Sequence, residues 1–347
     1  MGVCVNGSTG RNQSLDILRG IAILLVLGFH YAYFFFWARI GWIGVDLFFV
    51  LSGFLISGLL FNEYKKYGCV KVGRFWIRRG FKIYPPFYVF MAVTAIIFLT
   101  AGTRTIDRDI LSDLFFLQNY LPHVWDHGWS LAVEEHFYLL LPILLLLMIR
   151  SSKNKADPFR SIPYIFIALS VSCLALRIAT LRITGAPSPA VSAPTHLRMD
   201  SLFAGVTLGY YNHFHPDLFK RLSQPSLLPP GLLFVSPSFL FGVNTVFMTT
   251  IGFTMLFIGF GHILMSMVNR KPSRNLIARL LARIGYHSYS IYLWHAPLAF
   301  LVFRNSPHLV YFLVYLAVCV VLGVVMSRLI ERPSLALRDK LFPSRIC

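Results

Sequence analysis

The first apolar segment of the sequence carries an arginine near its start, Arg19, and a histidine, His30, eleven residues further on. In an α-helix this spacing places both side chains on one face, about 16 Å apart along the axis. Ionisable groups inside a membrane are costly and often functional. The pair fits a site that holds a charged group at one end and moves a proton at the other. A snorkelling arginine and a hydrogen-bonded core histidine explain it equally well.

A second polar pattern occupies residues 127–138. His127, Ser130, Glu134 and Tyr138 recur at helical spacing, and Glu135 is turned about 100° away from them. A glutamate in a low-dielectric helix can orient an imidazole or exchange a proton near neutral pH. The structural alternative is a glutamate that pairs with an arginine of a neighbouring helix.

A basic stretch lies between the second and third apolar segments. Lipid headgroups and the usual excess of positive charge in cytoplasmic loops explain most of it. Guanidinium groups beside Phe75 and Trp76 also suit a donor that contains nucleotide phosphates. Its seven cations are Lys65, Lys66, Lys71, Arg74, Arg78, Arg79 and Lys82.

Four further polar residues stand in or beside apolar segments. His295 follows several hydroxyl side chains and, taken alone, fits a satisfied core histidine. Asp46 lies in a glycine-punctuated segment, where it fits a helix cap and the glycines indicate close helix packing. Arg198 and Asp200 open the sixth apolar segment.

The composition is that of a membrane protein. The 347 residues are 56% hydrophobic and only 13% charged, with a mean hydropathy of +0.65, whereas soluble domains carry about 25% charge. We predict an all-α polytopic protein, one domain over 1–347, with about ten transmembrane helices near 15–37, 43–62, 83–102, 129–149, 161–184, 199–212, 226–242, 243–268, 284–303 and 307–330. The five cysteines have no metal-ligand spacing, so we expect no metal.

The distribution of positive charge sets the predicted orientation. With the N-terminus in the cytoplasm, most of the 32 lysines and arginines fall on the cytoplasmic side, and so do both termini. Orientation therefore explains the net charge of +18, and we expect no nucleic-acid partner. Glycosylation patterns at Asn6 and Asn12 fall on the same side and are interpreted as chance.

Depth in the membrane brings separate residues together. His30 is expected about 22 Å above the inner boundary of a ~30 Å hydrocarbon core, and Glu134 and Glu135 about 8 Å below the outer boundary. These depths coincide. Asp46 and Arg198 are expected in the same outer third.

In order along the chain, these residues resemble the membrane acyltransferase-3 family, which O-acylates carbohydrates and some macrolides. The likeness covers nearly the whole chain. It implies an acyl-CoA donor reached from the cytoplasm and an acceptor hydroxyl in or beyond the outer half of the membrane. It also implies essential roles for Arg19, His30 and a glutamate of the fourth apolar segment, Glu134 or Glu135. Lys82 stands where the family has an arginine, and lysine cannot make a bidentate phosphate contact. The matching parts are Arg19-x10-His30, blocks at 44–54, 78–85 and 127–138, Arg198-x-Asp200, and 289–295.

We therefore expect a multi-pass enzyme of the bacterial inner membrane that moves an acyl group, acetyl by family habit, from acyl-CoA to a carbohydrate hydroxyl. His30 would be the general base, oriented by Glu134 or Glu135, and an acyl-histidine intermediate is not excluded. The alternative is a proton-coupled transporter with His30, Glu134 and His295 as a relay, although no inverted repeat is visible. Donor binding is assigned to Arg19, Arg74, Arg78, Arg79 and Lys82. Acceptor binding or structural support is assigned to Asp46, His127, Ser130, Tyr138, Arg198, Asp200 and His295.

Overall fold

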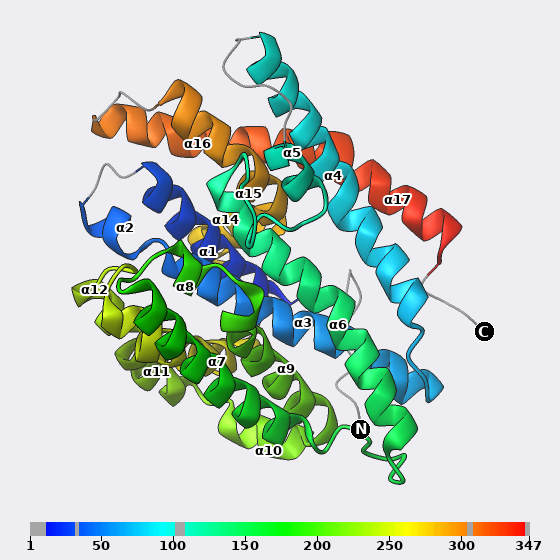
Figure 1. Cartoon of the computed structure of the whole chain (residues 1–347). Helices are drawn as coiled ribbons and strands as arrows, with labels where there is room; N and C mark the ends of the chain where they lie inside the picture. The colour runs from blue at the N-terminus through cyan, green and yellow to red at the C-terminus, as the bar shows by residue number, and fades with distance from the viewer. Residues whose placement is uncertain (1–11, 32–34, 101–107, 304–307, 344–347) are drawn as a thin grey trace.

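The computed structural model describes residues 12–31, 35–100, 108–303 and 308–343, and every regular element within them is a helix (Figure 1). Seven helical stretches there are long and apolar enough to cross a membrane, which confirms a polytopic all-α membrane protein. Their helices are α1 (Gln13–Tyr31), α3 (Ile43–Tyr67), α4 (Val72–Thr100), α6 (Trp129–Ser151), α7 (Ile162–Thr184), α13 (Phe253–Val268) and α16 (Leu309–Met326).

The other three apolar segments predicted from the sequence form shorter helices. They are α9 (Met199–Phe214), α11 (Leu228–Val235) continued by α12 (Pro237–Leu240), and α15 (Ser288–Pro297). The C-terminal helix α17 (Arg332–Leu341) follows α16 after a π-helical turn, Ser327–Glu331. Short connecting helices are α2 (Phe35–Ile40), α5 (Arg108–Leu114), α8 (Pro189–Ser192), α10 (Pro216–Leu222) and α14 (Leu276–Tyr286). Asn6 lies outside the described residues.

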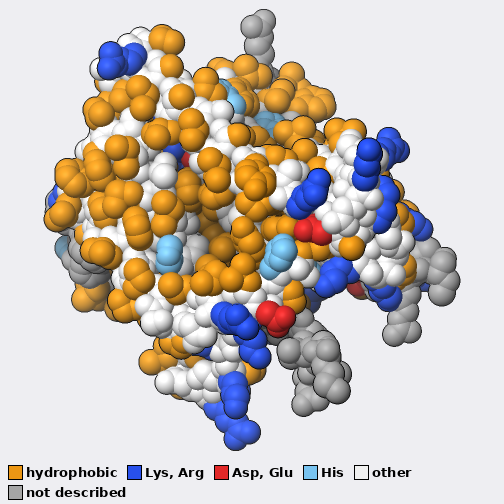
Figure 2. Space-filling view, turned by 90° about the horizontal axis from the view of Figure 1, so that it is seen from below, with side chains coloured by type: hydrophobic (Ala, Val, Ile, Leu, Met, Phe, Trp, Pro, Cys, Tyr) orange, Lys and Arg blue, Asp and Glu red, His pale blue; other side chains and the backbone are white. Residues whose placement is uncertain are grey.

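The basic loops meet at one end of the helix bundle. Lys65 at the end of α3 donates a hydrogen bond to the backbone carbonyl of His213 in α9 at 2.8 Å. The neighbouring Tyr64 donates to the carbonyl of Lys155, between α6 and α7, at 2.7 Å. We call this the basic end. Figure 2 shows one face of the molecule, on which hydrophobic side chains cover the middle and left while most lysine and arginine side chains gather toward the right and lower edges.

Helix α3 lies at the centre of the bundle, between α1 and α9 (Figure 1). The backbones come so close that Gly53 of α3 faces the carbonyl of Leu202, and Gly205 of α9 faces the carbonyl of Val50. A Cβ at either glycine would collide with backbone, which does not yield as a flexible side chain does. The close helix packing expected from the glycines of residues 44–54 is confirmed.

Candidate functional site

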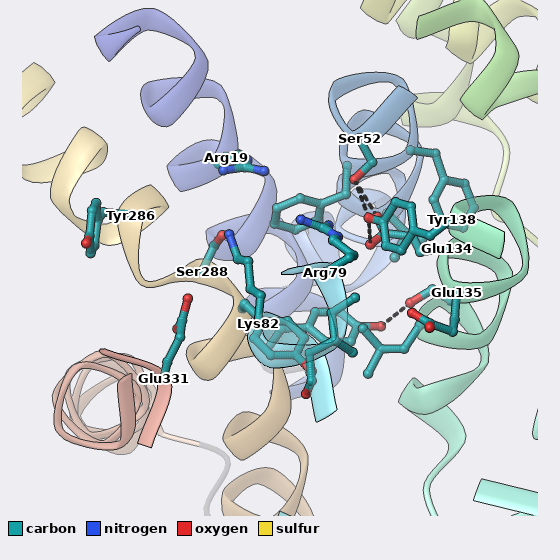
Figure 3. A pocket seen from close by; sticks show the side chains of 18 residues that line it. Arg19, Ser52, Arg79, Lys82, Glu134, Glu135, Tyr138, Tyr286, Ser288 and Glu331 are labelled. Carbon is teal, nitrogen blue, oxygen red and sulfur yellow. Dashed lines mark hydrogen bonds between the residues drawn. The ribbon is translucent and has the colours of Figure 1, made fainter. Parts of the chain in front are cut away.

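A polar cavity opens among α1, α3, α4, α6 and α15 on the side of the basic end. It encloses about 810 Å³, including the part open to solvent. Its cations are Arg19 of α1 and Arg79 and Lys82 of α4 (Figure 3). The guanidinium carbon of Arg79 lies 4.2 Å from the centre of the Tyr138 ring. We call this space the basic cavity.

The two adjacent glutamates of α6 also line the basic cavity. The Glu134 carboxylate accepts hydrogen bonds from the hydroxyls of Ser52 and Tyr138, each at 2.7 Å. Glu135 accepts one from the hydroxyl of Tyr84 at 2.5 Å. These bonds tie α6 to α3 and α4, so both acids help to shape the cavity.

Sequence reasoning missed a third acid of the basic cavity, Glu331, which lies on the side away from the α6 glutamates (Figure 3). Only 6% of it is exposed. Its carboxylate accepts hydrogen bonds from Ser290 and Ser327, both at 3.0 Å. It ends the π-helical turn after α16, and such turns often mark functional positions. The available signal was an acid at the end of the last apolar segment.

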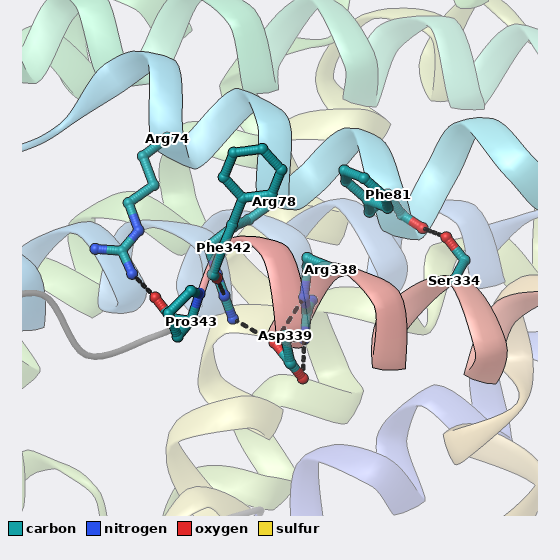
Figure 4. Close-up of polar contacts among 8 residues, drawn as sticks. All are labelled: Arg74, Arg78, Phe81, Ser334, Arg338, Asp339, Phe342 and Pro343. Atoms are coloured by element: carbon teal, nitrogen blue, oxygen red, sulfur yellow. Dashed lines mark hydrogen bonds and ion pairs between the residues drawn. The ribbon is translucent and has the colours of Figure 1, made fainter.

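Arg74 and Arg78, two of the five predicted donor cations, do not line the basic cavity (Figure 4). Arg74 donates to the backbone carbonyl of Pro343, and Arg78 to that of Phe342. Arg78 also forms an ion pair with Asp339 at 3.0 Å. These arginines lie on the face of α4 turned toward α17. Their contacts therefore hold the C-terminal helix and the residues after it against α4.

A second cavity, of about 1540 Å³ including its open part, lies away from the basic end. His30 and His127 line it, together with the ion-paired Asp46 and Arg198. We call it the histidine cavity. Tyr120 belongs to its wall, and its hydroxyl forms a hydrogen bond of 3.0 Å with Nδ1 of His196. Burial lowers the pKa of His196, so its imidazole is neutral near pH 7.

His30, in the wall of the histidine cavity, contacts the imidazole of His295, which is fully buried behind it and lies 265 residues further along the chain. Nδ1 of His295 lies 2.6 Å from the carbonyl of Tyr292, and because a carbonyl can only accept, this nitrogen carries the proton. Nε2 of His295 therefore accepts, and Nδ1 of His30 donates to it at 3.1 Å. The carbonyl of Val26 lies at the same distance from Nδ1 of His30. This arrangement leaves Nε2 of His30 unprotonated.

The structure places Glu134 in the basic cavity and His30 in the histidine cavity, contrary to the coincident depths expected from the sequence. Of the polar residues in 127–138, it is His127 that lies beside His30 and His295: its ring centre is 5.1 Å from that of His295. The depth estimate set Trp129 at the membrane boundary. However, His127 is only 3% exposed, because its ring packs against those of Phe90, Tyr292 and His295.

Two ion pairs with almost no exposure support the wall of the histidine cavity. Asp46 binds Arg198 at 2.5 Å, and Asp200 binds Arg177 at 2.9 Å. The Arg198 guanidinium also lies 3.7 Å above the ring of Phe253. Asp46 and Asp200 thus join α3, α7 and α9, and removing one member would leave an uncompensated buried charge. Within the described residues, no cluster of histidine, cysteine and acidic side chains could hold a metal ion.

The helices and the two cavities define a multi-pass membrane protein with a polar, histidine-containing site buried between its helices. The chain belongs to the acyltransferase-3 family, whose model, described as an acyltransferase domain, matches residues 12–328. The acyltransferase domain thus accounts for most of the chain.

Curated relatives carry related names. The chain is 28% identical over 356 residues to peptidoglycan O-acetyltransferase OatA of Listeria monocytogenes, covering 92% of this chain and 55% of that protein. It is 30% identical over 351 residues to "Putative O-acetyltransferase SACOL0978" of Staphylococcus aureus, covering 92% and 56%. The chain thus spans about half the length of these relatives. No solved structure matches it.

Proposed function

We propose that this protein is an integral-membrane O-acetyltransferase that moves an acetyl group from acyl-CoA to a carbohydrate hydroxyl. The observation that carries the proposal is the His30–His295 pair at 3.1 Å, which leaves His30 Nε2 unprotonated at the wall of the histidine cavity. The family membership and the names of the relatives support acyl transfer to oxygen.

The basic cavity is the proposed donor site. Arg19, Arg79 and Lys82 offer cations for the CoA phosphates at the end of the bundle that carries the basic loops. The positive-inside bias makes that end cytoplasmic, where acyl-CoA is present. Arg19 and His30 lie on one helix, about 16 Å apart along its axis, so the extended pantetheine arm can run from the phosphates toward the histidines.

The proposed reaction is a direct acyl transfer. The acceptor hydroxyl attacks the thioester carbonyl while Nε2 of His30 takes the hydroxyl proton, a C–O bond forms and the C–S bond breaks. The proton then passes from His30 to the departing thiolate, which leaves as CoA thiol. His295 accepts the hydrogen bond from Nδ1–H of His30 throughout, so it orients the ring and stabilises the imidazolium, as the acid of a catalytic triad does.

The histidine cavity is the proposed acceptor site. Its wall combines the aromatic rings of Tyr120 and Trp129 with the amides of Gln118 and Asn119 and the carboxylate of Asp126. Such a mixture of flat apolar faces and fixed polar groups suits a polyhydroxylated sugar. The names of the relatives favour a glycan of the cell envelope, such as peptidoglycan.

Replacement of His30 tests the proposal. Membranes that contain the protein are supplied with labelled acetyl-CoA, and label esterified to the glycan fraction is measured. His30→Ala should lower transfer by about 10²- to 10⁴-fold, the usual contribution of a general base, while acetyl-CoA still binds. His262→Ala is the matched control, because His262 makes the same contact with the carbonyl four residues earlier but lines neither cavity. Transfer near the normal rate in His30→Ala would refute the mechanism.

A further inference from the structure

The basic and histidine cavities share two wall residues, Val45 of α3 and Tyr292 of α15. All the other residues that line them belong to one cavity alone. Arg19 lines the first cavity and His30 the second. An acyl group that enters with its carrier on the Arg19 side must therefore pass Val45 and Tyr292 to reach His30.

Two helices carry matched residues along this route. On α15, Ser288 lines the basic cavity, Tyr292 lines both cavities and His295 contacts His30. The spacings of four and three residues keep these three side chains on one helix face. On α6, Ser130 contacts the hydroxyl of Tyr292, with the carbonyl of His127 beyond it. The two cavities thus meet where Tyr292 of α15 contacts Ser130 of α6.

Hydrogen bonds fix the Tyr292 ring across this boundary. Its hydroxyl donates to the carbonyl of His127 at 2.6 Å and, with its own proton used, accepts from Ser130 at 2.6 Å. The ring centre lies 6.5 Å from that of Phe48, in the wall of the basic cavity, and 5.4 Å from that of His295. The Tyr292 side chain is only 6% exposed, and its hydroxyl makes two hydrogen bonds. The ring therefore cannot rotate out of this position without breaking both bonds.

We propose that Tyr292 and Val45 form a constriction that selects the length of the transferred acyl group, admitting acetyl and rejecting longer chains. This inference rests on the proposed function, in which the donor lies in the basic cavity and the base in the histidine cavity. The acyl carbonyl must reach His30 while the carrier stays behind, so each added methylene has to fit beside the Tyr292 ring. One methylene that does not fit an apolar site changes discrimination by about 10-fold or more.

The test measures acyl selectivity without a purified acceptor. Membranes of the cells that make the protein receive equal amounts of acetyl-, propionyl- and butyryl-CoA, and the acids released by alkali from the glycan fraction are quantified. The wild type should give mainly acetate. Tyr292→Leu should raise the propionate-to-acetate ratio by about 10-fold, because it removes the ring. Tyr164→Leu is the matched control and should keep the wild-type ratio, because Tyr164 is 74% exposed on α7 and lines neither cavity.

An unchanged ratio in a folded Tyr292→Leu protein would overturn the constriction. If that variant does not fold, Val45→Ala decides, because it widens the same point from α3: a raised ratio supports the inference and an unchanged one refutes it. Absence of every esterified acid in the wild type would instead refute the proposed function, and the inference with it.

Discussion

Replacement of His295 should separate a positioning role in acyl transfer from a merely structural one. His295→Leu removes one of the two acceptors of Nδ1–H of His30 and leaves the carbonyl of Val26 as the other. The lost hydrogen bond, of 3.1 Å, becomes charge-assisted once His30 takes a proton. A hydrogen bond to a charged group contributes about 1.5–3 kcal/mol. Since each 1.36 kcal/mol in the barrier is tenfold in rate, kcat should fall by about 10- to 150-fold. The KM for acetyl-CoA should change little, because the donor cations lie in the other cavity.

His295→Gln provides the matched rescue. The glutamine amide oxygen can accept the same hydrogen bond, so this variant should recover at least part of kcat. The assay is the initial rate of acetyl transfer in membranes over a range of acetyl-CoA concentrations, with thermal stability measured in parallel. Equal loss of kcat in the leucine and glutamine variants, or normal kcat in His295→Leu, would refute the positioning role.

Two further predictions concern acidic side chains. Asp46→Asn leaves Arg198 as an unpaired buried charge and should lower the free energy of unfolding by about 3–5 kcal/mol, seen as a lower Tm in detergent. Asp339→Asn, in the partly exposed pair with Arg78, is the control and should cost at most about 1 kcal/mol. Equal Tm values in the two variants would contradict this contrast. Glu134→Gln keeps one oxygen acceptor and lies away from the histidine pair, so it should retain kcat within about 10-fold. A loss as large as that of a missing general base would instead place the Glu134 carboxylate in the chemistry.

The sequence predicted the helical segments well, because hydropathy is a property of each segment alone. Hydropathy located each apolar stretch, and the spacing of Arg19 and His30 placed them on one face of α1. The structure sets them in separate cavities that share a wall, as a site spread along one helix requires.

Contacts between helices could not be predicted from the sequence. The contact between His30 and His295 joins residues 265 positions apart. Nothing in the local sequence around His295 distinguishes a partner of His30 from an ordinary core histidine. Depth counting misplaced Glu134 because it equated the first apolar residue of α6 with the membrane boundary. Arg78 and Arg79 are neighbours in sequence, yet about 100° of rotation sends one to the C-terminal helix and the other into the basic cavity.

Donor binding in the basic cavity is the central claim, and thermal stability of the detergent-purified protein tests it without any acceptor. A ligand that binds only the folded state stabilises it, by about 2.7 kcal/mol at 100 times Kd. Acetyl-CoA and CoA should raise the Tm saturably and GTP should not. Arg19→Gln should abolish the shift, while Arg78→Gln, which loosens only the C-terminal helix, should keep it. No shift with millimolar acetyl-CoA, or an equal shift in Arg19→Gln, would contradict a donor site at the basic cavity.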